Sequence, residues 1–151
     1  MSLPGIEIDE KVIVSSTGAL KLDKVPKKMV VVGGGYIGLE MGSVWSRLGA
    51  EVQVVEFLDH ITPGMDKEIS SEFMKILKKQ GIKFNMQNKV ETIKNNKSGA
   101  IVSTVDKDGN KNKFDCDVVL ISVGRKPNTI TYAVPVAVSY THLTLPTTPY
   151  V

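Results

Sequence analysis

The 151-residue chain, with 42% hydrophobic and 23% charged residues, has the size and balance of one globular domain with a real core. A net charge of +3, with dispersed lysines between residues 75 and 97, argues against nucleic-acid binding and indicates a solvated face. No apolar run approaches the roughly 20 residues that span a membrane. The N-terminus shows no signal-peptide pattern, so we expect a cytoplasmic or organelle-matrix location.

Neither disulfide nor metal chemistry is expected. The single cysteine, Cys116, precedes an apolar run, and we interpret it as a small buried residue, with a reactive thiol as the alternative. The two histidines, His60 and His142, fall in expected loops without ligand partners at metal spacing. We therefore assign no metal site.

The first 27 residues do not have the pattern of an independent domain. Residues 6–8 and 12–14 are short extended runs, residues 15–18 are typical of a turn, and Pro26 comes just before the first long apolar run. We interpret residues 1–27 as a connector that enters from another domain.

A strand, a glycine turn and a helix follow. Residues 29–32 are predicted as a strand buried on both faces, and the next glycines have the G-x-G-x-x-G spacing. Gly33 suits the tight turn, Gly35 a close backbone approach to a pyrophosphate, and Gly38 close packing of helix on strand. The free N–H groups and dipole at the helix start would hold the phosphates. The predicted apolar stripe of this helix comprises Ile37, Met41, Val44, Trp45 and Leu48.

A second strand, residues 51–55, ends at Glu56. A carboxylate at this point accepts hydrogen bonds from the adenosine ribose 2′-OH, whereas a 2′-phosphate would be repelled and would need arginines. Residues 57–60 contain neither Arg nor Lys. The pattern favours NAD over NADP, with a solvated strand-end glutamate as the alternative.

The remaining elements predict an α/β fold. Asp66 is a suitable N-cap for a helix that ends at Gly81, and residues 82–86 form a third strand candidate. The apolar face expected for this helix comprises Ile69, Phe73, Ile76 and Leu77. Three short strands separated by turns then predict an antiparallel meander at residues 90–93, 100–105 and 111–114. Residues 118–122 return to a parallel strand. The fold class is thus a Rossmann-like parallel sheet with a β-meander replacing one crossover, of the FAD/NAD(P)-binding type.

Taken together, these motifs resemble the NAD-binding domain of the dihydrolipoamide dehydrogenases, within the pyridine nucleotide-disulfide oxidoreductase family. The resemblance runs over roughly residues 3–129. It is carried by residues 15–20 (SSTGAL), 33–40 (GGGYIGLE), 42–48 (GSVWSRL), 55–58 (VEFL), 78–81 (KKQG) and 124–128 (GRKPN). It implies an oxidoreductase that oxidises dihydrolipoamide with NAD+ through FAD and a redox disulfide.

The resemblance also implies residues that bind NAD. They are Gly33, Gly34, Gly35, Tyr36, Ile37, Gly38, Leu39 and Glu40 around the pyrophosphate, Glu56 on the ribose, Val90 on the adenine side and Gly124 near the nicotinamide arm. Glu40 would lie near the junction of nicotinamide and flavin, or be a carboxylate favoured by the helix dipole. Tyr36 would cover the flavin, or be an ordinary turn residue. Arg125 would steer a phosphate or, as we favour, cap its turn.

Several parts of the family pattern are absent from the sequence: the redox-active Cys-x-x-x-x-Cys, the FAD-binding glycine motif, and the dimerisation domain with its catalytic His–Glu pair. We therefore expect no catalytic residue in this chain. We expect a connector from a missing flavin domain at 1–27, an NAD-binding domain at 28–129, and a foreign or disordered tail at 130–151, which has three prolines and no charged residue.

For the full-length parent the resemblance implies FAD, a homodimer and a 2-oxo acid dehydrogenase complex as partner, in the bacterial cytoplasm or the mitochondrial matrix. Two alternatives stay open. The chain is the NAD-binding domain of another flavoprotein disulfide reductase, or it is a stand-alone NAD-sensing module.

Overall fold

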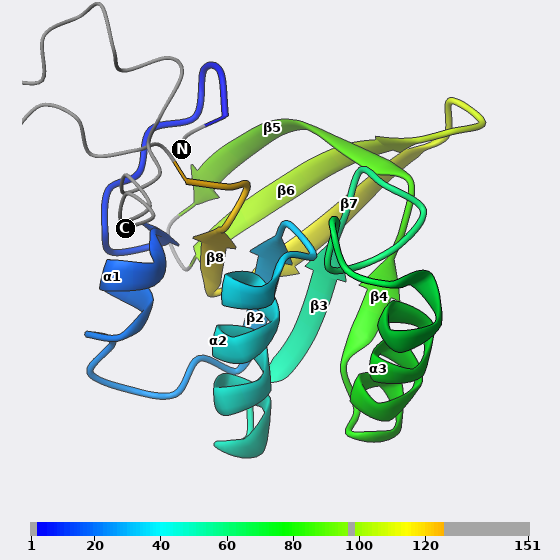
Figure 1. The fold of residues 1–151 in the computed structure, drawn as a ribbon. Coiled ribbons are helices and arrows are strands. Elements are labelled where there is room, and N and C mark those ends of the chain that lie inside the picture. Colours follow the sequence, from blue (N-terminus) through cyan, green and yellow to red (C-terminus); the bar gives the residue numbers. More distant parts are fainter. Residues whose placement is uncertain (1–2, 97–98, 126–151) are drawn as a thin grey trace, which may run out of the picture.

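The computed structural model describes residues 3–96 and 99–125 (Figure 1). The predicted tail at 130–151 lies outside these residues. Within them, the helices and strands are β1 (Ile13–Val14), α1 (Ser16–Ala19), β2 (Lys28–Val32), α2 (Tyr36–Arg47), β3 (Glu51–Val55), α3 (Lys67–Lys79), β4 (Lys83–Asn85), β5 (Asn88–Asn96), β6 (Gly99–Asp106), β7 (Lys111–Cys116) and β8 (Val118–Ile121).

Five parallel strands form the central sheet, in the order β1-β8-β2-β3-β4. After β4 the chain forms the antiparallel sheet β5-β6-β7 and then returns as β8 on the other side of β2. The meander therefore takes the place of a crossover helix, and the predicted fold class is confirmed.

The two faces of the central sheet are covered by different elements (Figure 1). One core cluster joins Ala19, Leu39 and Leu77 of the three helices to the face of the sheet that carries Val31 and Val52. The other joins the meander to the opposite face. The strands are thus covered on both sides, which explains their continuous apolar runs.

The helix α2 begins and ends as expected, but its buried face differs from the predicted stripe. The buried residues are Gly38, Leu39, Gly42 and Trp45, whereas Val44 and Leu48 are 46% and 56% exposed. The glycines let the helix lie close to the sheet, since a Cβ at Gly42 would already meet Val52 at 3.4 Å. Their side of the helix therefore becomes the contact face, although it is not the most hydrophobic.

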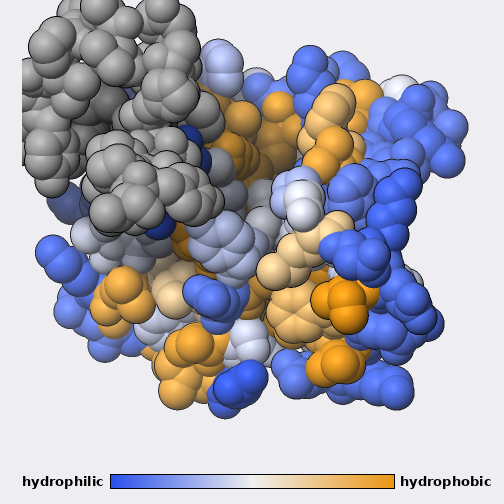
Figure 2. All heavy atoms as spheres, in the orientation of Figure 1, coloured by the Kyte–Doolittle hydropathy of each residue, from blue (hydrophilic) through white to orange (hydrophobic). Residues whose placement is uncertain are grey.

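Only part of the predicted apolar face of α3 is confirmed. Leu77 is buried and Phe73 half-buried, but Ile69 and Ile76 are exposed. In Figure 2, hydrophobic residues accordingly lie among hydrophilic ones on the face that carries α2 and α3. None of the helices in residues 3–96 and 99–125 is long and apolar enough to cross a bilayer.

The N-terminal segment contributes to the sheet. Its strand β1 pairs with β8, Ile13 opposite Val119, while residues 6–8 belong to no strand. Residues 15–18, predicted as a turn, instead begin α1, because the Ser15 hydroxyl caps the helix by accepting from the Thr17 N–H at 3.1 Å.

Candidate functional site

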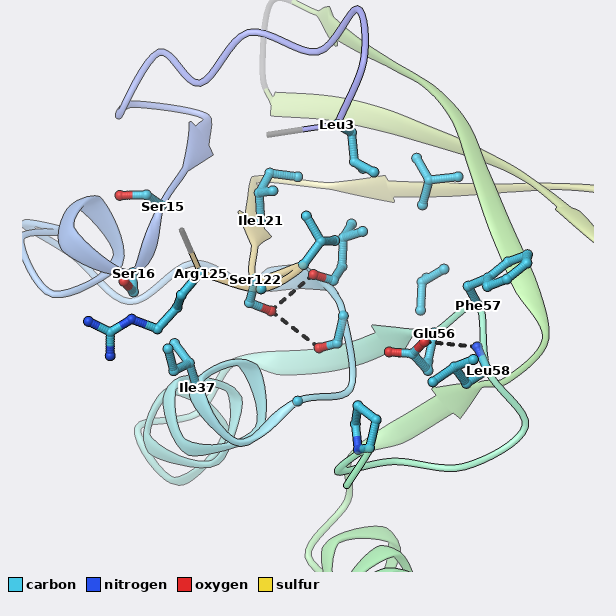
Figure 3. A pocket seen from close by; sticks show the side chains of 18 of the residues that line it. Leu3, Ser15, Ser16, Ile37, Glu56, Phe57, Leu58, Ile121, Ser122 and Arg125 are labelled. Carbon is cyan, nitrogen blue, oxygen red and sulfur yellow. Dashed lines mark hydrogen bonds between the residues drawn. The ribbon is translucent and has the colours of Figure 1, made fainter. Parts of the chain in front are cut away.

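A cleft of about 1320 Å³ lies at the carboxyl ends of β2, β3 and β8. The chain runs from β2 to β3 on one side and returns in β8 on the other, so the cleft occupies the topological switch point of the sheet, where open α/β folds bind ligands. In Figure 3, Glu56 and Leu58 lie on one side of the cleft and Ser15, Ser16 and Arg125 on the other. The predicted cofactor residues that line it are Gly33, Gly35, Tyr36, Ile37, Glu56, Val90 and Gly124.

The glycine turn lines the cleft, and its glycines differ in what an added side chain would meet. Gly33 has φ +109°, and a Cβ there would come within 2.5 Å of the Ser122 carbonyl oxygen. A Cβ at Gly38 would lie 2.5 Å from the Gly33 carbonyl oxygen and against the Ser122 side chain. A Cβ at Gly35, by contrast, would meet no protein atom within 4 Å. The open space at Gly35 is therefore available to a ligand.

The N-terminus of α2 is suited to an anion. Gly35 is the N-cap, and no side chain caps the helix. The Leu39 N–H is the first to bond within the helix, to Gly35 at 3.1 Å. The N–H groups of residues 36–38 therefore have no partner inside the helix. Because Gly35, Tyr36 and Ile37 line the cleft, the positive end of the dipole faces it.

The side chain of Glu56 is held in place by hydrogen bonds to the backbone. Its residue is only 9% exposed. One carboxylate oxygen accepts the Gly34 N–H at 2.5 Å. The other accepts the Leu58 N–H at 2.8 Å, a bond drawn in Figure 3. The Gly34 carbonyl in turn accepts the Thr62 N–H at 2.8 Å. The glycine turn and the loop after β3 are thus linked by hydrogen bonds to both the N–H and the carbonyl of Gly34.

Four predicted cofactor residues do not line the cleft. Gly34 lies beneath Glu56, Gly38 and Leu39 are buried, and Glu40 is exposed on α2. Gly38 and Leu39 pack the helix onto the sheet. Any role of these four in cofactor binding stays a prediction.

Sequence reasoning missed part of the cleft wall. Ser122 lines the cleft, and its hydroxyl donates to the carbonyls of Val32 at 2.9 Å and Gly33 at 3.2 Å. Its place at the carboxyl end of the predicted strand 118–122 was a usable signal, because ligands lie at and beyond carboxyl strand ends. The wall also includes Ser15, Ser16 and Thr17 around the start of α1. Those residues were predicted as a turn and as part of a family motif, but not as part of the site.

The charges that line the cleft are balanced. Two carboxylates, Glu56 and Glu91, and two cations, Lys89 and Arg125, line it. Arg125 extends beside Ile37 and Ser16 in Figure 3. Across the part of the chain that the structure describes, no cluster of His, Cys, Asp and Glu could hold a metal ion. Cys116 lies outside the cleft and is buried, as predicted, and burial raises the pKa of its thiol to about 12.

Known proteins resemble this chain closely over most of its length. A dihydrolipoamide dehydrogenase from Chaetomium thermophilum is 57% identical over 128 residues, which are 83% of this chain and 25% of that protein. A mitochondrial dihydrolipoyl dehydrogenase from Caenorhabditis elegans is also 57% identical over 128 residues, 83% of this chain and 26% of that protein. The chain thus spans about a quarter of the length of these relatives.

Solved structures are also similar to this chain. A flavoprotein disulfide reductase from Escherichia coli, induced by HOCl, superposes with a TM-score of 0.72 and 28% identity, over 85% of this chain and 28% of that one. The family model for pyridine nucleotide-disulphide oxidoreductases matches residues 1–142. The chain therefore belongs to the pyridine nucleotide-disulphide oxidoreductase family.

Proposed function

We propose that the cleft binds NAD and that this chain is the NAD-binding part of a dihydrolipoamide dehydrogenase, which oxidises dihydrolipoamide with NAD+ through FAD and a redox disulfide. The observation that carries the proposal is the buried Glu56 carboxylate beside an uncapped helix start in one cleft. The identity to dihydrolipoamide dehydrogenases supports the choice within the family. Bound NAD+ would supply a hydride acceptor.

The residues of the cleft fit a dinucleotide. The N–H groups at the start of α2 would bind the pyrophosphate, and Gly35 leaves the room for it. The carboxylate of Glu56 uses one acceptor position on each oxygen for Gly34 and Leu58. Since a carboxylate offers about four such positions, roughly two are left for the hydroxyls of the adenosine ribose. Tyr36, Ile37, Val90 and Gly124 would complete the wall.

The same carboxylate would discriminate between NAD and NADP. A 2′-phosphate would place negative charge against a buried carboxylate, and residues 57–60 offer no arginine to offset it. The two cations of the wall do not come from the loop after β3: Lys89 lies in β5, and Arg125 follows β8. We therefore expect NADH to bind at least about tenfold more tightly than NADPH, on the order of 1.4 kcal/mol.

Calorimetric titration of the 151-residue chain with NADH and NADPH tests the proposal. Glu56→Gln should reduce the preference for NADH, because the amide neither repels the 2′-phosphate nor accepts at both of its terminal atoms. Glu68→Gln, an exposed carboxylate in the first turn of α3, is the matched control and should leave the preference unchanged. Equal affinities of the unaltered chain for the two nucleotides would contradict the proposal.

The wider context is proposed with it. In the parent enzyme, residues 1–27 would connect a flavin domain to this one while adding β1 to its sheet, and residues 28–129 would form the NAD-binding domain. Residues 130–151 would be the tail predicted as non-family, although the family model matches as far as residue 142. FAD, a homodimer and a 2-oxo acid dehydrogenase complex would be the partners. The mitochondrial matrix suits the C. elegans relative, and the bacterial cytoplasm is the other compartment proposed.

A further inference from the structure

The amide side chain of Asn88 lies where the central sheet passes into the meander. The residue is 9% exposed, and its side chain makes hydrogen bonds to Met86, Thr104 and Asn112. Its Nδ2 donates to the Met86 carbonyl at 2.9 Å, and its Oδ1 accepts the Thr104 hydroxyl at 2.9 Å and the Asn112 amide at 3.3 Å. Thr104, on β6, is 1% exposed. The hydrogen bonds of this one amide thus close the turn after β4 and link it to β6 and β7.

That turn holds the strand end that carries Glu56. The Glu56 N–H donates to the Asn85 carbonyl at 3.0 Å, and the Glu56 carbonyl accepts the Asn88 N–H at 2.9 Å. The Gln87 N–H donates to the Leu58 carbonyl at 3.0 Å. Three backbone hydrogen bonds therefore link residues 56–58 to residues 85–88.

The turn needs support, because its central residue is strained. Gln87 has φ +54°, a left-handed conformation that a residue with a side chain adopts at a cost. The bond from Asn88 Nδ2 to Met86 spans this residue and closes the chain around it. Without the amide, the direction of the Gln87 N–H, and with it the position of Leu58, would be less fixed.

We propose that Asn88 is a positioning residue for nucleotide binding, which orients the Glu56 carboxylate through the turn at residues 86–88 and through Leu58, with Thr104 as its anchor in the meander. The link is the Leu58 N–H, which donates to one oxygen of that carboxylate. The inference rests on the proposed function, since it assumes that Glu56 binds the ribose. It makes the meander part of the machinery that selects the nucleotide.

Affinities of the 151-residue chain for NADH and NADPH test the inference. Asn88→Ala and Thr104→Val should each weaken NADH binding about two- to tenfold, the factor that one hydrogen bond of ordinary net strength supplies. NADPH binding, which does not use the carboxylate, should change less, so the preference for NADH falls. Thr104→Ser keeps the hydroxyl and should keep the preference.

General loosening of the meander needs its own control. Val102→Ala removes a fully buried side chain of β6 that has no polar atoms, so it should lower the thermal midpoint without changing the ratio of the two affinities. If Val102→Ala shifted that ratio as much as Asn88→Ala does, loosening alone would explain the effect and the inference would be overturned.

A double-mutant cycle with Glu56→Gln separates positioning from direct contact, which is a real alternative because Asn88 also lines the cleft. If Asn88 acts through Glu56, Asn88→Ala should cost little further NADH affinity in the Glu56→Gln background. A full effect in that background would mean that Asn88 touches the ligand itself, and would overturn the positioning role. If Glu56→Gln alone left NADH binding unchanged, the ribose role in the proposed function would fail first, and the inference with it.

Discussion

Two glycines of the same turn should separate stability from binding. We predict that Gly33→Ala mainly destabilises the fold, whereas Gly35→Ala leaves the fold nearly intact and weakens NADH binding. The two substitutions add the same methyl group two residues apart. They differ in what that methyl meets.

The size of each effect follows from the structure. At Gly33 the backbone has φ +109°, which costs a side-chain-bearing residue about 1–3 kcal/mol. The new Cβ would also lie 2.5 Å from the Ser122 carbonyl oxygen, a backbone atom that cannot rotate away, and such overpacking costs about 1–3 kcal/mol. The sum of roughly 2–6 kcal/mol should lower the thermal midpoint by roughly 5–20 °C in a chain of this size.

At Gly35 neither cost applies. Its φ is −74°, and no protein atom lies within 4 Å of the added Cβ. Replacing an N-cap glycine by alanine costs under about 1 kcal/mol. The methyl group would, however, occupy the cleft wall where the pyrophosphate is proposed to approach, and we expect NADH affinity to fall at least about tenfold.

Thermal unfolding followed by circular dichroism, and calorimetric titration with NADH, measure the two effects on the same preparations. Equal losses of stability in both variants would refute the structural reasoning about Gly33. Undiminished NADH affinity in Gly35→Ala would refute the proposed place of the pyrophosphate, without bearing on the fold.

Two further predictions concern other parts of the chain. Asp66→Ala should lower the free energy of unfolding by about 1 kcal/mol, because the carboxylate accepts the N–H groups of Glu68 and Ile69 at the start of α3. Urea denaturation measures this loss, and Asp66→Asn, the control, should largely retain the cap. The Cys116 thiol, whose pKa burial raises from 9.0 to about 12, should resist maleimide at pH 8 until the protein unfolds. The thiol of the unfolded chain ionises at a lower pH than the buried thiol. The contribution of the buried thiol to stability should therefore be present below pH 9 and be lost as the pH rises towards about 12. Cys116→Ser should abolish this decline.

The local motif could be predicted because its signals are local. A strand, a glycine spacing, a helix and a strand-end glutamate follow one another within residues 29–56, and each has its own residue preference. The same holds for Asp66, whose side chain bonds to N–H groups two and three residues away. No knowledge of distant partners was needed for these elements.

The packing face of α2 could not be predicted in this way. Hydropathy marks Val44 and Leu48 as the apolar side of α2, but close approach to the sheet depends on the absence of side chains at Gly38 and Gly42. A hydrophobic pattern gives little weight to a glycine, although a glycine decides how near two backbones come. The predicted and observed faces differ for that reason.

The Asn88 network shows what a sequence pattern can predict about a buried hydrogen bond and what it cannot. Along β6 the buried positions alternate as Ala100, Val102 and Thr104, so a polar side chain falls in the apolar phase of the strand. A buried hydroxyl requires a hydrogen-bond partner, and the sequence alone therefore indicates that Thr104 has one. Its identity depends on the register between β5 and β6, in which Thr104 lies opposite Val90, beside a bulge that precedes Thr92. Register is set by the whole meander, so the partner, Asn88, emerges only when the strands are aligned in space.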